Sequence, residues 1–301
     1  MDTDVLNIIN LSKSFKKRQV LKNVSFKIKA GDIVGFVGPN ASGKTTTMKC
    51  CVGLLKRIAG DVEIVGQSIT KKYEEAVKNV LWIPDQNAFY ENFSANTNLK
   101  IYTPFYRDID KEDFDAATEK VGLYHRMKDN VGTYSLGMTR RLALAKCLII
   151  KPKLILMDEP LNGLDPVGVE VFKNMVVELS TNYGMSFLIS SHNLNVLSDI
   201  CHRIVTINNG TVLGEIDVRN NTIRVVKLVV EDADVVIDLL KKNFNIDATQ
   251  AENKQLLFDL DKSLIPNVIK LVASKDRIIS ISTAIDLEKT YIDLFRGAKI
   301  E

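Results

Sequence analysis

The 301-residue chain has no stretch of about 18 consecutive apolar and uncharged residues, which is the length that a membrane-spanning helix needs. Its first residues include Asp2 and Asp4 and lack the basic start of a signal peptide. The net charge of +3 is too small to indicate a nucleic-acid-binding surface, and the run Lys16-Lys17-Arg18 is typical of a solvated turn. We therefore expect a protein that neither enters a membrane nor binds nucleic acid.

Cysteine is scarce, and its spacing is not that of metal ligands. Of the four cysteines, Cys50, Cys51, Cys147 and Cys201, three lie in apolar helical stretches. This usage is typical of reduced thiols in a cytosolic core, so no zinc site is expected. With 46% hydrophobic and 26% charged residues, a chain of this length is expected to form about two globular domains.

A phosphate-binding motif stands between a predicted strand and a predicted helix. The apolar run 33–37 predicts a buried strand, and Thr45–Leu55 predicts a helix. Between them the chain fits G-x-x-x-x-G-K-[ST], whose glycines let backbone N–H groups turn toward phosphates at a helix start. Lys44 is expected to supply a charge for the outer phosphates, and Thr45 a ligand for Mg²⁺. The residues expected at the phosphates are Gly38, Pro39, Asn40, Ala41, Ser42, Gly43, Lys44, Thr45 and Thr46.

A second apolar run, Leu154–Met157, predicts a central parallel strand and ends in two acidic residues. Because ligands of parallel sheets bind at the carboxyl ends of strands, Asp158 and Glu159 are expected beside the phosphates. Asp158 is then placed to hold Mg²⁺, and Glu159 to orient the attacking water or take its proton. The two motifs together predict a nucleotide-hydrolysing site.

The segment Tyr134-Ser135-Leu136-Gly137-Met138, followed by a helical stretch, resembles the signature of the ATP-binding cassette (ABC) ATPases. Ser135 and Gly137 match that signature, whereas the other three positions depart from it. The resemblance covers roughly residues 3 to 215 and implies that Ser135 and Gly137 contact the γ-phosphate of ATP.

The same resemblance implies roles for three further residues. Phe15 corresponds to the aromatic residue that stacks on adenine, and Asp165 to the fixed acid of the loop after the acidic strand. His192 follows the apolar strand 187–191 and corresponds to the histidine that contacts the γ-phosphate.

One position departs from the family in a way that bears on coupling to a transporter. The family has a Gln after the strand that ends near Pro84, where it links the metal and the water to the transporter subunit. In this chain Asp85 takes that position and Gln86 comes one residue later. An Asp is able to accept Mg²⁺ or water, so Asp85 is a candidate metal ligand, with Gln86 the alternative.

The resemblance implies an α/β fold, a P-loop NTPase of the ABC cassette type. We expect it over residues 1–217, with a RecA-like core, a β-subdomain and a helical subdomain over about 86–150. A hairpin across Asn208-Asn209-Gly210 is expected near its end, followed by a polar linker over 218–222. We expect residues 223–301 to form a small α+β accessory domain.

The pattern of this last domain predicts a ferredoxin-like βαββαβ order and shows no catalytic grouping. A packing or dimerisation role is therefore expected, with a ligand sensor as the alternative. Strands are predicted over 223–230, 246–249, 255–260 and 277–282, and helices over 232–243, 264–274 and, as a closing helix, 286–295.

The resemblance implies an ATPase subunit that uses ATP and Mg²⁺ to power a separately encoded integral membrane permease, most similar to exporters of drugs, peptides or lipids. In the family the signature completes the ATP site of a second ABC ATPase subunit, so a head-to-tail homodimer or heterodimer is expected. Such a subunit is cytoplasmic and held at the inner face of the cell membrane by its permease.

The alternative is a soluble ABC ATPase that acts on ribosomes or DNA. Ribosome-acting relatives carry two cassettes, and DNA-repair relatives carry a long coiled coil between the two motifs, where this chain has only about 90 residues. A small-molecule kinase, a third class, has no use for the Ser135-Gly137 signature followed by the acidic pair and His192. These features favour the transporter subunit.

Overall fold

The computed structural model describes residues 3–86, 88–105, 110–192, 194–219, 223–251, 254–284, 291–292 and 294–295. The chain divides into two compact units, Met1–Ile216 and Asp217–Glu301. Among the described residues, no helix combines the length and the apolar character that crossing a bilayer requires.

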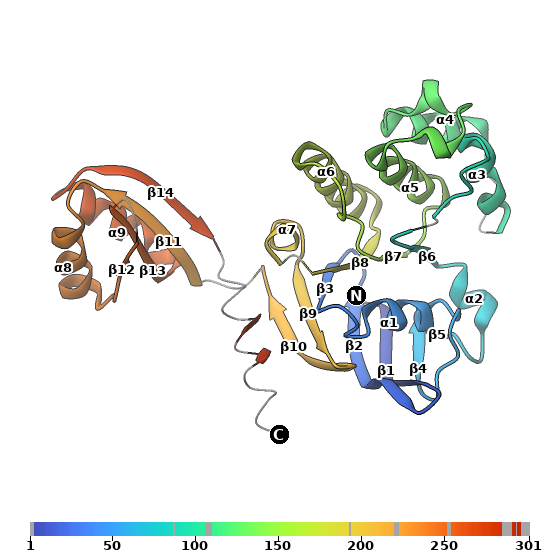
Figure 1. Cartoon of the computed structure of the whole chain (residues 1–301), viewed down its shortest axis with the longest axis horizontal. Helices are drawn as coiled ribbons and strands as arrows, with labels where there is room; N and C mark the ends of the chain where they lie inside the picture. The colour runs from blue at the N-terminus through green and yellow to red at the C-terminus, as the bar shows by residue number, and fades with distance from the viewer. Residues whose placement is uncertain are drawn as a thin grey trace. The chain divides into compact units, whose positions relative to one another are not determined.

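The first unit is built on a six-stranded sheet. Its strands are β3 (Ile33–Val37), β6 (Val80–Ile83), β7 (Leu154–Met157), β8 (Ser186–Ser191), β9 (Arg203–Asn208) and β10 (Thr211–Asp217). They follow the order β10-β9-β3-β8-β7-β6, in which β3 runs parallel to β8 and β9, and β7 runs parallel to β6 and β8. The carboxyl ends of β3, β8, β7 and β6 therefore lie side by side at one edge (Figure 1).

The sequence prediction of the site depended on two of these strands, β3 and β7. β3 and β7 have the predicted bounds, and every residue in both is buried. Such continuous burial is typical of central strands in a parallel sheet that is covered on both faces.

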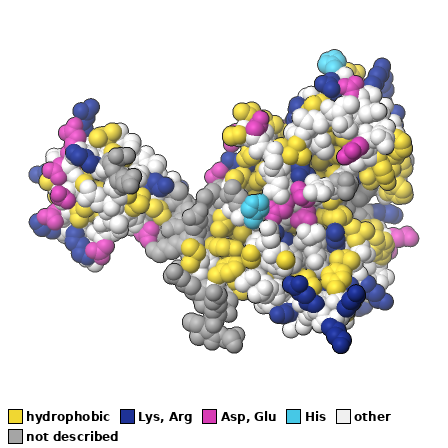
Figure 2. Space-filling view, viewed as in Figure 1, with side chains coloured by type: hydrophobic (Ala, Val, Ile, Leu, Met, Phe, Trp, Pro, Cys, Tyr) yellow, Lys and Arg dark blue, Asp and Glu magenta, His cyan; other side chains and the backbone are white. Residues whose placement is uncertain are grey.

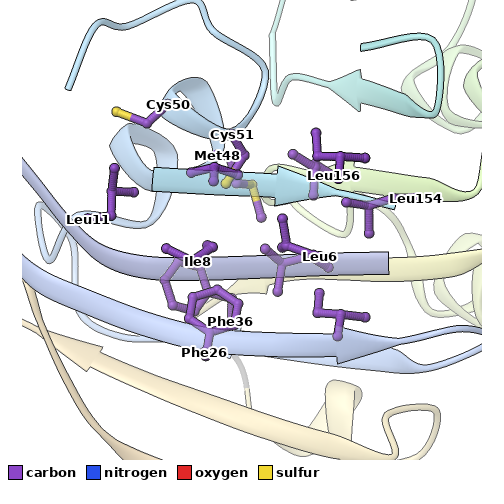
Figure 3. Packing of buried hydrophobic residues seen from close by; sticks show 14 of the residues in the cluster. Leu6, Ile8, Leu11, Phe26, Phe36, Met48, Cys50, Cys51, Leu154 and Leu156 are labelled. Carbon is purple, nitrogen blue, oxygen red and sulfur yellow. The ribbon is translucent and has the colours of Figure 1, made fainter. Parts of the chain in front are cut away.

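A second, antiparallel sheet packs against the first and supplies much of the core. Its order is β2-β1-β4-β5. The strands are β1 (Asp4–Phe15), β2 (Arg18–Lys29), β4 (Ala59–Ile64) and β5 (Gln67–Ser68). Figure 3 shows Leu6 and Ile8 of β1 close to Phe26 of β2 and Phe36 of β3, whose ring centroids are 5.3 Å apart. Burial of each such side chain stabilises the folded state by roughly 1.5–3 kcal/mol, so this core holds the two sheets together.

Helices fill the connections between the strands. They are α1 (Lys44–Cys51), α2 (Tyr73–Val77), α3 (Ala95–Tyr102), α4 (Lys111–Lys120), α5 (Leu136–Ile150), α6 (Pro166–Tyr183) and α7 (Leu194–Ser198), with 3₁₀ turns η1 (Thr103–Phe105), η2 (Tyr124–Arg126) and η3 (Val131–Thr133). Figure 1 shows α3, α4 and α5 gathered in one lobe, which is the segment between β6 and β7.

The predicted end of the helix after the phosphate-binding motif was wrong. The helix was expected to reach Leu55, but α1 ends at Cys51. Gly53 takes a φ of 74°, and its N–H donates to the Cys50 carbonyl, so the chain leaves the helix in a left-handed turn.

The predicted hairpin is confirmed and is attached to the phosphate-binding loop. It joins β9 to β10 through Asn209 and Gly210, whose φ values of 46° and 80° are both positive. The Gly210 N–H donates to the Ser42 carbonyl at 2.9 Å, and the Gly210 carbonyl accepts from the Lys22 N–H at 2.8 Å. The turn therefore holds the loop against β2.

The second unit contains a four-stranded antiparallel sheet of order β12-β13-β11-β14. Its elements are β11 (Ile223–Val230), α8 (Ala233–Phe244), β12 (Thr249–Gln250), β13 (Gln255–Asp261), η5 (Lys262–Leu264), α9 (Ile265–Ala273) and β14 (Ile278–Ala284). The βαββαβ order matches the prediction, and the strand order is that of a ferredoxin-like sheet. The strand predicted over 246–249 was misplaced, because residues 246–248 lie outside any strand and β12 covers only Thr249–Gln250. Its core includes Val226, Val236, Phe258 and Val268.

Two predicted segments of this region fall largely on residues outside the described part of the chain. Of the closing helix expected over 286–295, the structure describes only Tyr291, Ile292, Leu294 and Phe295. Residues 220–222 of the expected linker are likewise outside it.

One buried charge in the first unit is unusual. Lys146, on α5, is 6% exposed, and its Nζ lies 3.3 Å from the centroid of the Tyr102 ring and 6.0 Å from that of Phe89. Among the described residues, none offers this ammonium a carboxylate or another hydrogen-bond acceptor. Burial lowers the pKa of Lys146 to about 8, which means that the fold bears part of the cost of an unpaired charge.

We expect the substitution Lys146→Met to stabilise the first unit at pH 7 by on the order of 2 kcal/mol, because it removes that charge and keeps an unbranched side chain. The pKa of the lysine is lowered in the folded state, so the penalty is complete below pH 8 and fades as the pH rises toward 10.5. Denaturant unfolding followed by the fluorescence of Trp82, the single tryptophan, measures this. A variant that is less stable than the parent at pH 7 would contradict it.

Candidate nucleotide-binding site

A cleft of about 330 Å³ lies over the loop that connects β3 to α1. Its lining consists of Phe15, Arg18, Val20, Asn40, Ala41, Ser42, Gly43, Lys44, Thr45, Thr46 and Glu159. The structure therefore brings the predicted adenine-stacking residue, most of the predicted phosphate loop and the predicted base to one cavity. Arg18 belongs to the run predicted to form a solvated turn, and the sequence did not predict its place in the cleft. The pairing of Arg18 with Phe15 at the start of the β1–β2 hairpin brings it there.

Two glycines of the loop are required by close contacts. A Cβ on Gly38 would lie 2.1 Å from the carbonyl oxygen of Ile207, on β9. Gly43 has a φ of 115°, and a Cβ there would lie 2.7 Å from Leu21 on β2. The loop is therefore pressed against the sheet, which leaves its other side facing the cleft.

Lys44 lies at the centre of this loop and is almost fully buried. Its Nζ donates to the carbonyl oxygens of Gly38 at 2.7 Å and Pro39 at 3.3 Å, and it lies 3.5 Å from Glu159 Oε1. The lysine thus places a fixed positive charge beside the loop and the acidic residue.

Asp158 joins three elements through one carboxylate. The Thr45 hydroxyl, on α1, donates to Asp158 Oδ2 at 2.6 Å, and the Ser190 hydroxyl, on β8, donates to Oδ1 at 2.7 Å. Asp158 follows β7 and is 5% exposed. The arrangement puts a hydroxyl oxygen and a carboxylate oxygen side by side at the phosphate loop. Ser190 was missed, although a serine within the apolar run 187–191 was a signal for a buried polar contact.

Glu159 is held by contacts on both sides. Its N–H donates to Ser190 Oγ at 2.9 Å, and its Oε2 lies 3.0 Å from His192 Nδ1. Its φ of 45° is in the left-handed region, which costs a residue other than glycine roughly 1–2 kcal/mol. The adjoining strand ends hold this backbone geometry, which aims the carboxylate at both Lys44 and His192.

Ser135, Gly137 and Asp165 do not line the cleft. The Ser135 hydroxyl accepts from the Met138 N–H at 3.2 Å and caps α5, and Asp165 accepts from the Gly168 N–H at 2.6 Å and caps α6. Ser135 is exposed, so it is accessible to a second molecule.

Asp85, a candidate metal ligand, forms an ion pair with a buried arginine. Its Oδ1 accepts from Arg140 Nη2 at 3.1 Å, and Arg140, on α5, is only 4% exposed. Burial lowers the pKa of the Arg140 guanidinium, and the Asp85 carboxylate opposes that shift. Gln86, the other candidate, is exposed. The loop after β6 is thereby fastened to α5, the helix that Ser135 caps.

The fold and this cluster define a P-loop nucleotide site with two acidic residues directly after β7. The family model described as ABC transporter matches residues 21–162. A solved structure of the ATP-binding subunit of an ABC transporter has a TM-score of 0.65 and 24% identity, and the match covers 71% of this chain and 90% of that one. This likeness shows the fold.

Relatives show the family. The uncharacterized ABC transporter ATP-binding protein YhcH of Bacillus subtilis (strain 168) is 41% identical over 216 residues, which is 72% of this chain and 70% of the relative. YcbN of the same organism, described in the same words, is 32% identical over 310 residues, or 99% of both chains. The bacitracin transport ATP-binding protein BcrA of Bacillus licheniformis is 28% identical, covering 98% of this chain and 99% of the relative.

The chain therefore belongs to the ABC transporter ATP-binding protein family. It is an ABC ATPase, and the fold class and enzyme class predicted from the sequence are confirmed.

We expect Asp85→Ala to lower the free energy of unfolding by about 2 kcal/mol, because it leaves the Arg140 guanidinium buried without its carboxylate. Arg140→Met is the second arm of a double-mutant cycle, and the double variant is expected to lose less than the sum of the two. Trp82, on β6 three residues before Asp85, reports unfolding by fluorescence. Strictly additive losses would show that the two side chains do not interact.

Proposed function

We propose that the chain is the ATP-hydrolysing subunit of a transporter and that it works as a head-to-tail dimer on a separately encoded membrane permease. Hydrolysis is supported by the group of polar side chains that meet at the carboxyl ends of β7 and β8. Asp158 binds Thr45, and Glu159 lies between Lys44 and His192. A binding module without turnover has no need of a second, strained carboxylate beside the first.

The residues present fit a Mg²⁺ ion. Thr45 Oγ1 and Asp158 Oδ2 are two hard oxygen ligands only 2.6 Å apart, next to the loop that receives the phosphates. Mg²⁺ is commonly bound by one or two such protein oxygens, with phosphate oxygens and water completing its shell. When bound there, it would neutralise charge on the phosphates. Because Asp85 is paired with Arg140, we propose that Gln86 serves the metal and the water in its place.

Each remaining residue then has a role that its contacts support. Phe15 is 45% exposed at the mouth of the cleft and offers a ring face to adenine. Lys44 and the loop from Gly38 to Thr46 hold the phosphates. Glu159 accepts the proton of the attacking water, and His192, 3.0 Å from it, orients the carboxylate and reaches the γ-phosphate.

Two copies are required because one chain does not complete the site. Ser135, Gly137 and Asp165 lie outside the cleft, and Ser135 is exposed at the start of α5. In a head-to-tail pair this surface faces the nucleotide of the second subunit, so two ATP molecules are held between the copies. A solved relative of 24% identity is described as a dimeric cassette bound to ADP and phosphate.

The permease has a candidate docking surface. We name as the coupling groove a cavity of about 430 Å³ between the end of α1, α2, β6, η1 and α5. Large apolar side chains stand exposed around it, including Leu54 at 58%, Tyr73 at 49% and Phe105 at 73%. Figure 2 shows apolar side chains on this side of the first unit, where Figure 1 draws α2 and α3. We propose that a cytoplasmic helix of the permease occupies this groove, which places the chain at the inner face of the membrane.

The names of relatives support an exporter. They include bacitracin and lantibiotic transport proteins and a lipopolysaccharide export protein. We therefore propose that the transporter exports drugs, peptides or lipids, with peptides favoured by the bacitracin and lantibiotic relatives. The same names do not favour the alternative of a soluble ATPase acting on ribosomes or DNA.

The variant Glu159→Gln tests the hydrolytic site. We expect turnover to fall about 100-fold or more because the proton acceptor is lost, while the affinity for ATP is largely kept. Phosphate release at saturating Mg-ATP and binding of a fluorescent ATP analogue measure the two quantities. Hydrolysis at the parent rate would exclude Glu159 as the base.

Sedimentation of the same variant with ATP tests the assembly. Glu159→Gln is expected to accumulate as an ATP-bound dimer, because it closes without hydrolysing. The matched control, Ser135→Arg, is expected to bind ATP but to stay monomeric, because a bulky cation blocks the surface assigned to the partner's nucleotide. Equal ATP-driven dimerisation of both variants would contradict the head-to-tail arrangement.

A further inference from the structure

Two hydrogen-bond donors that line the coupling groove have no acceptor within the described part of the chain. One is the Lys146 ammonium, which is in contact with the Tyr102 ring and has no carboxylate partner. The other is the indole N–H of Trp82, which is buried without a hydrogen-bond partner. Both residues line the groove.

Such donors are costly when a protein keeps them unpaired. A buried cation without a counter-charge destabilises the fold, and a buried N–H without an acceptor loses the hydrogen bond that it makes with water in the unfolded chain. An apolar side chain of the same length would pack against Tyr102 and Phe89 without that penalty. A second molecule that brings acceptors into the groove would recover this cost.

We propose that the coupling groove receives an apolar helix that carries an acidic side chain, whose carboxylate pairs with Lys146 and leaves an acceptor near the Trp82 indole. This inference rests on the proposed docking of the permease and adds the chemistry of the docked segment. The apolar rim, with Leu54 and Phe105, would take the apolar side chains of that helix. The buried ammonium would fix its register, since a carboxylate gains from this pairing only at one position along the groove.

The position of Lys146 links the groove to the nucleotide. Lys146 and Ser135 stand near opposite ends of α5, whose first turn carries the signature. Arg140, on the same helix, holds the loop after β6 through Asp85. An acidic residue bound at Lys146 therefore acts on the helix that presents Ser135 to the second subunit, which is how an event in the permease would reach the ATP site.

Synthetic helical peptides test this proposal on the full-length chain. Each has one apolar face of Leu and Phe and a single central residue that is Glu in one peptide and Gln in the other. Trp82, the single tryptophan, lines the groove and reports binding by its fluorescence. We expect the Glu peptide to bind the parent about tenfold more tightly than the Gln peptide.

Two variants identify the lysine responsible. In Lys146→Met the preference for Glu is expected to vanish while the Gln peptide still binds, because the apolar groove remains. Lys78, which lines the same groove but is exposed, supplies the matched control. Lys78→Met is expected to keep most of the preference, since an exposed charge is screened by solvent.

The outcomes separate this inference from the proposed docking. Equal binding of both peptides to the parent would overturn the acidic partner and leave an apolar docking groove. Loss of the preference in Lys78→Met but not in Lys146→Met would also overturn it. Binding of neither peptide would overturn both the inference and the groove as a helix-docking site, whereas ATP hydrolysis and dimerisation are tested independently of these peptides.

Discussion

The hydrogen bonds that Thr45 and Ser190 donate to Asp158 are the contact on which the rest of the site depends. Through one carboxylate they join α1, the end of β7 and β8, which come from distant parts of the sequence. The same serine accepts from the Glu159 N–H and so sets the direction of the second acidic residue. Sheet order makes this possible, because β8 lies between β3 and β7.

The helix α5 connects three parts of the first unit: the signature, the loop after β6 and the coupling groove. Ser135 caps its N-terminus, Arg140 in its first half contacts Asp85, and Lys146 near its C-terminus lines the coupling groove. A helix transmits displacement along its axis better than a loop does, so contacts at its two ends are mechanically coupled. The departure from the family at Asp85 is accommodated here, because the acidic side chain gains a buried arginine as partner.

Much of the site was predictable from the sequence because its motifs are local. The bounds of β3 and β7, and the placement of Lys44, Asp158 and Glu159 at one sheet edge, follow from apolar runs that end in polar residues. Contacts between distant segments were not predictable. Nothing in the sequence pairs Asp85 with Arg140 or brings Arg18 beside Phe15. Nor does it indicate that Lys146 has no acceptor among the described residues. The end of α1 was predicted too late, because the apolar pattern continues to Leu55 whereas the left-handed turn at Gly53 ends the helix at Cys51.

The most direct test of the central claim is the Mg²⁺ dependence of ATP affinity, measured by calorimetry for the parent and for Asp158→Asn, with Trp82 fluorescence to confirm folding. If the Thr45–Asp158 pair is the cation site, Mg²⁺ should raise the affinity of the parent for ATP about tenfold or more. The variant should bind metal-free ATP as the parent does and lose that gain. An equal gain with Mg²⁺ in both proteins would show that the cation is held elsewhere.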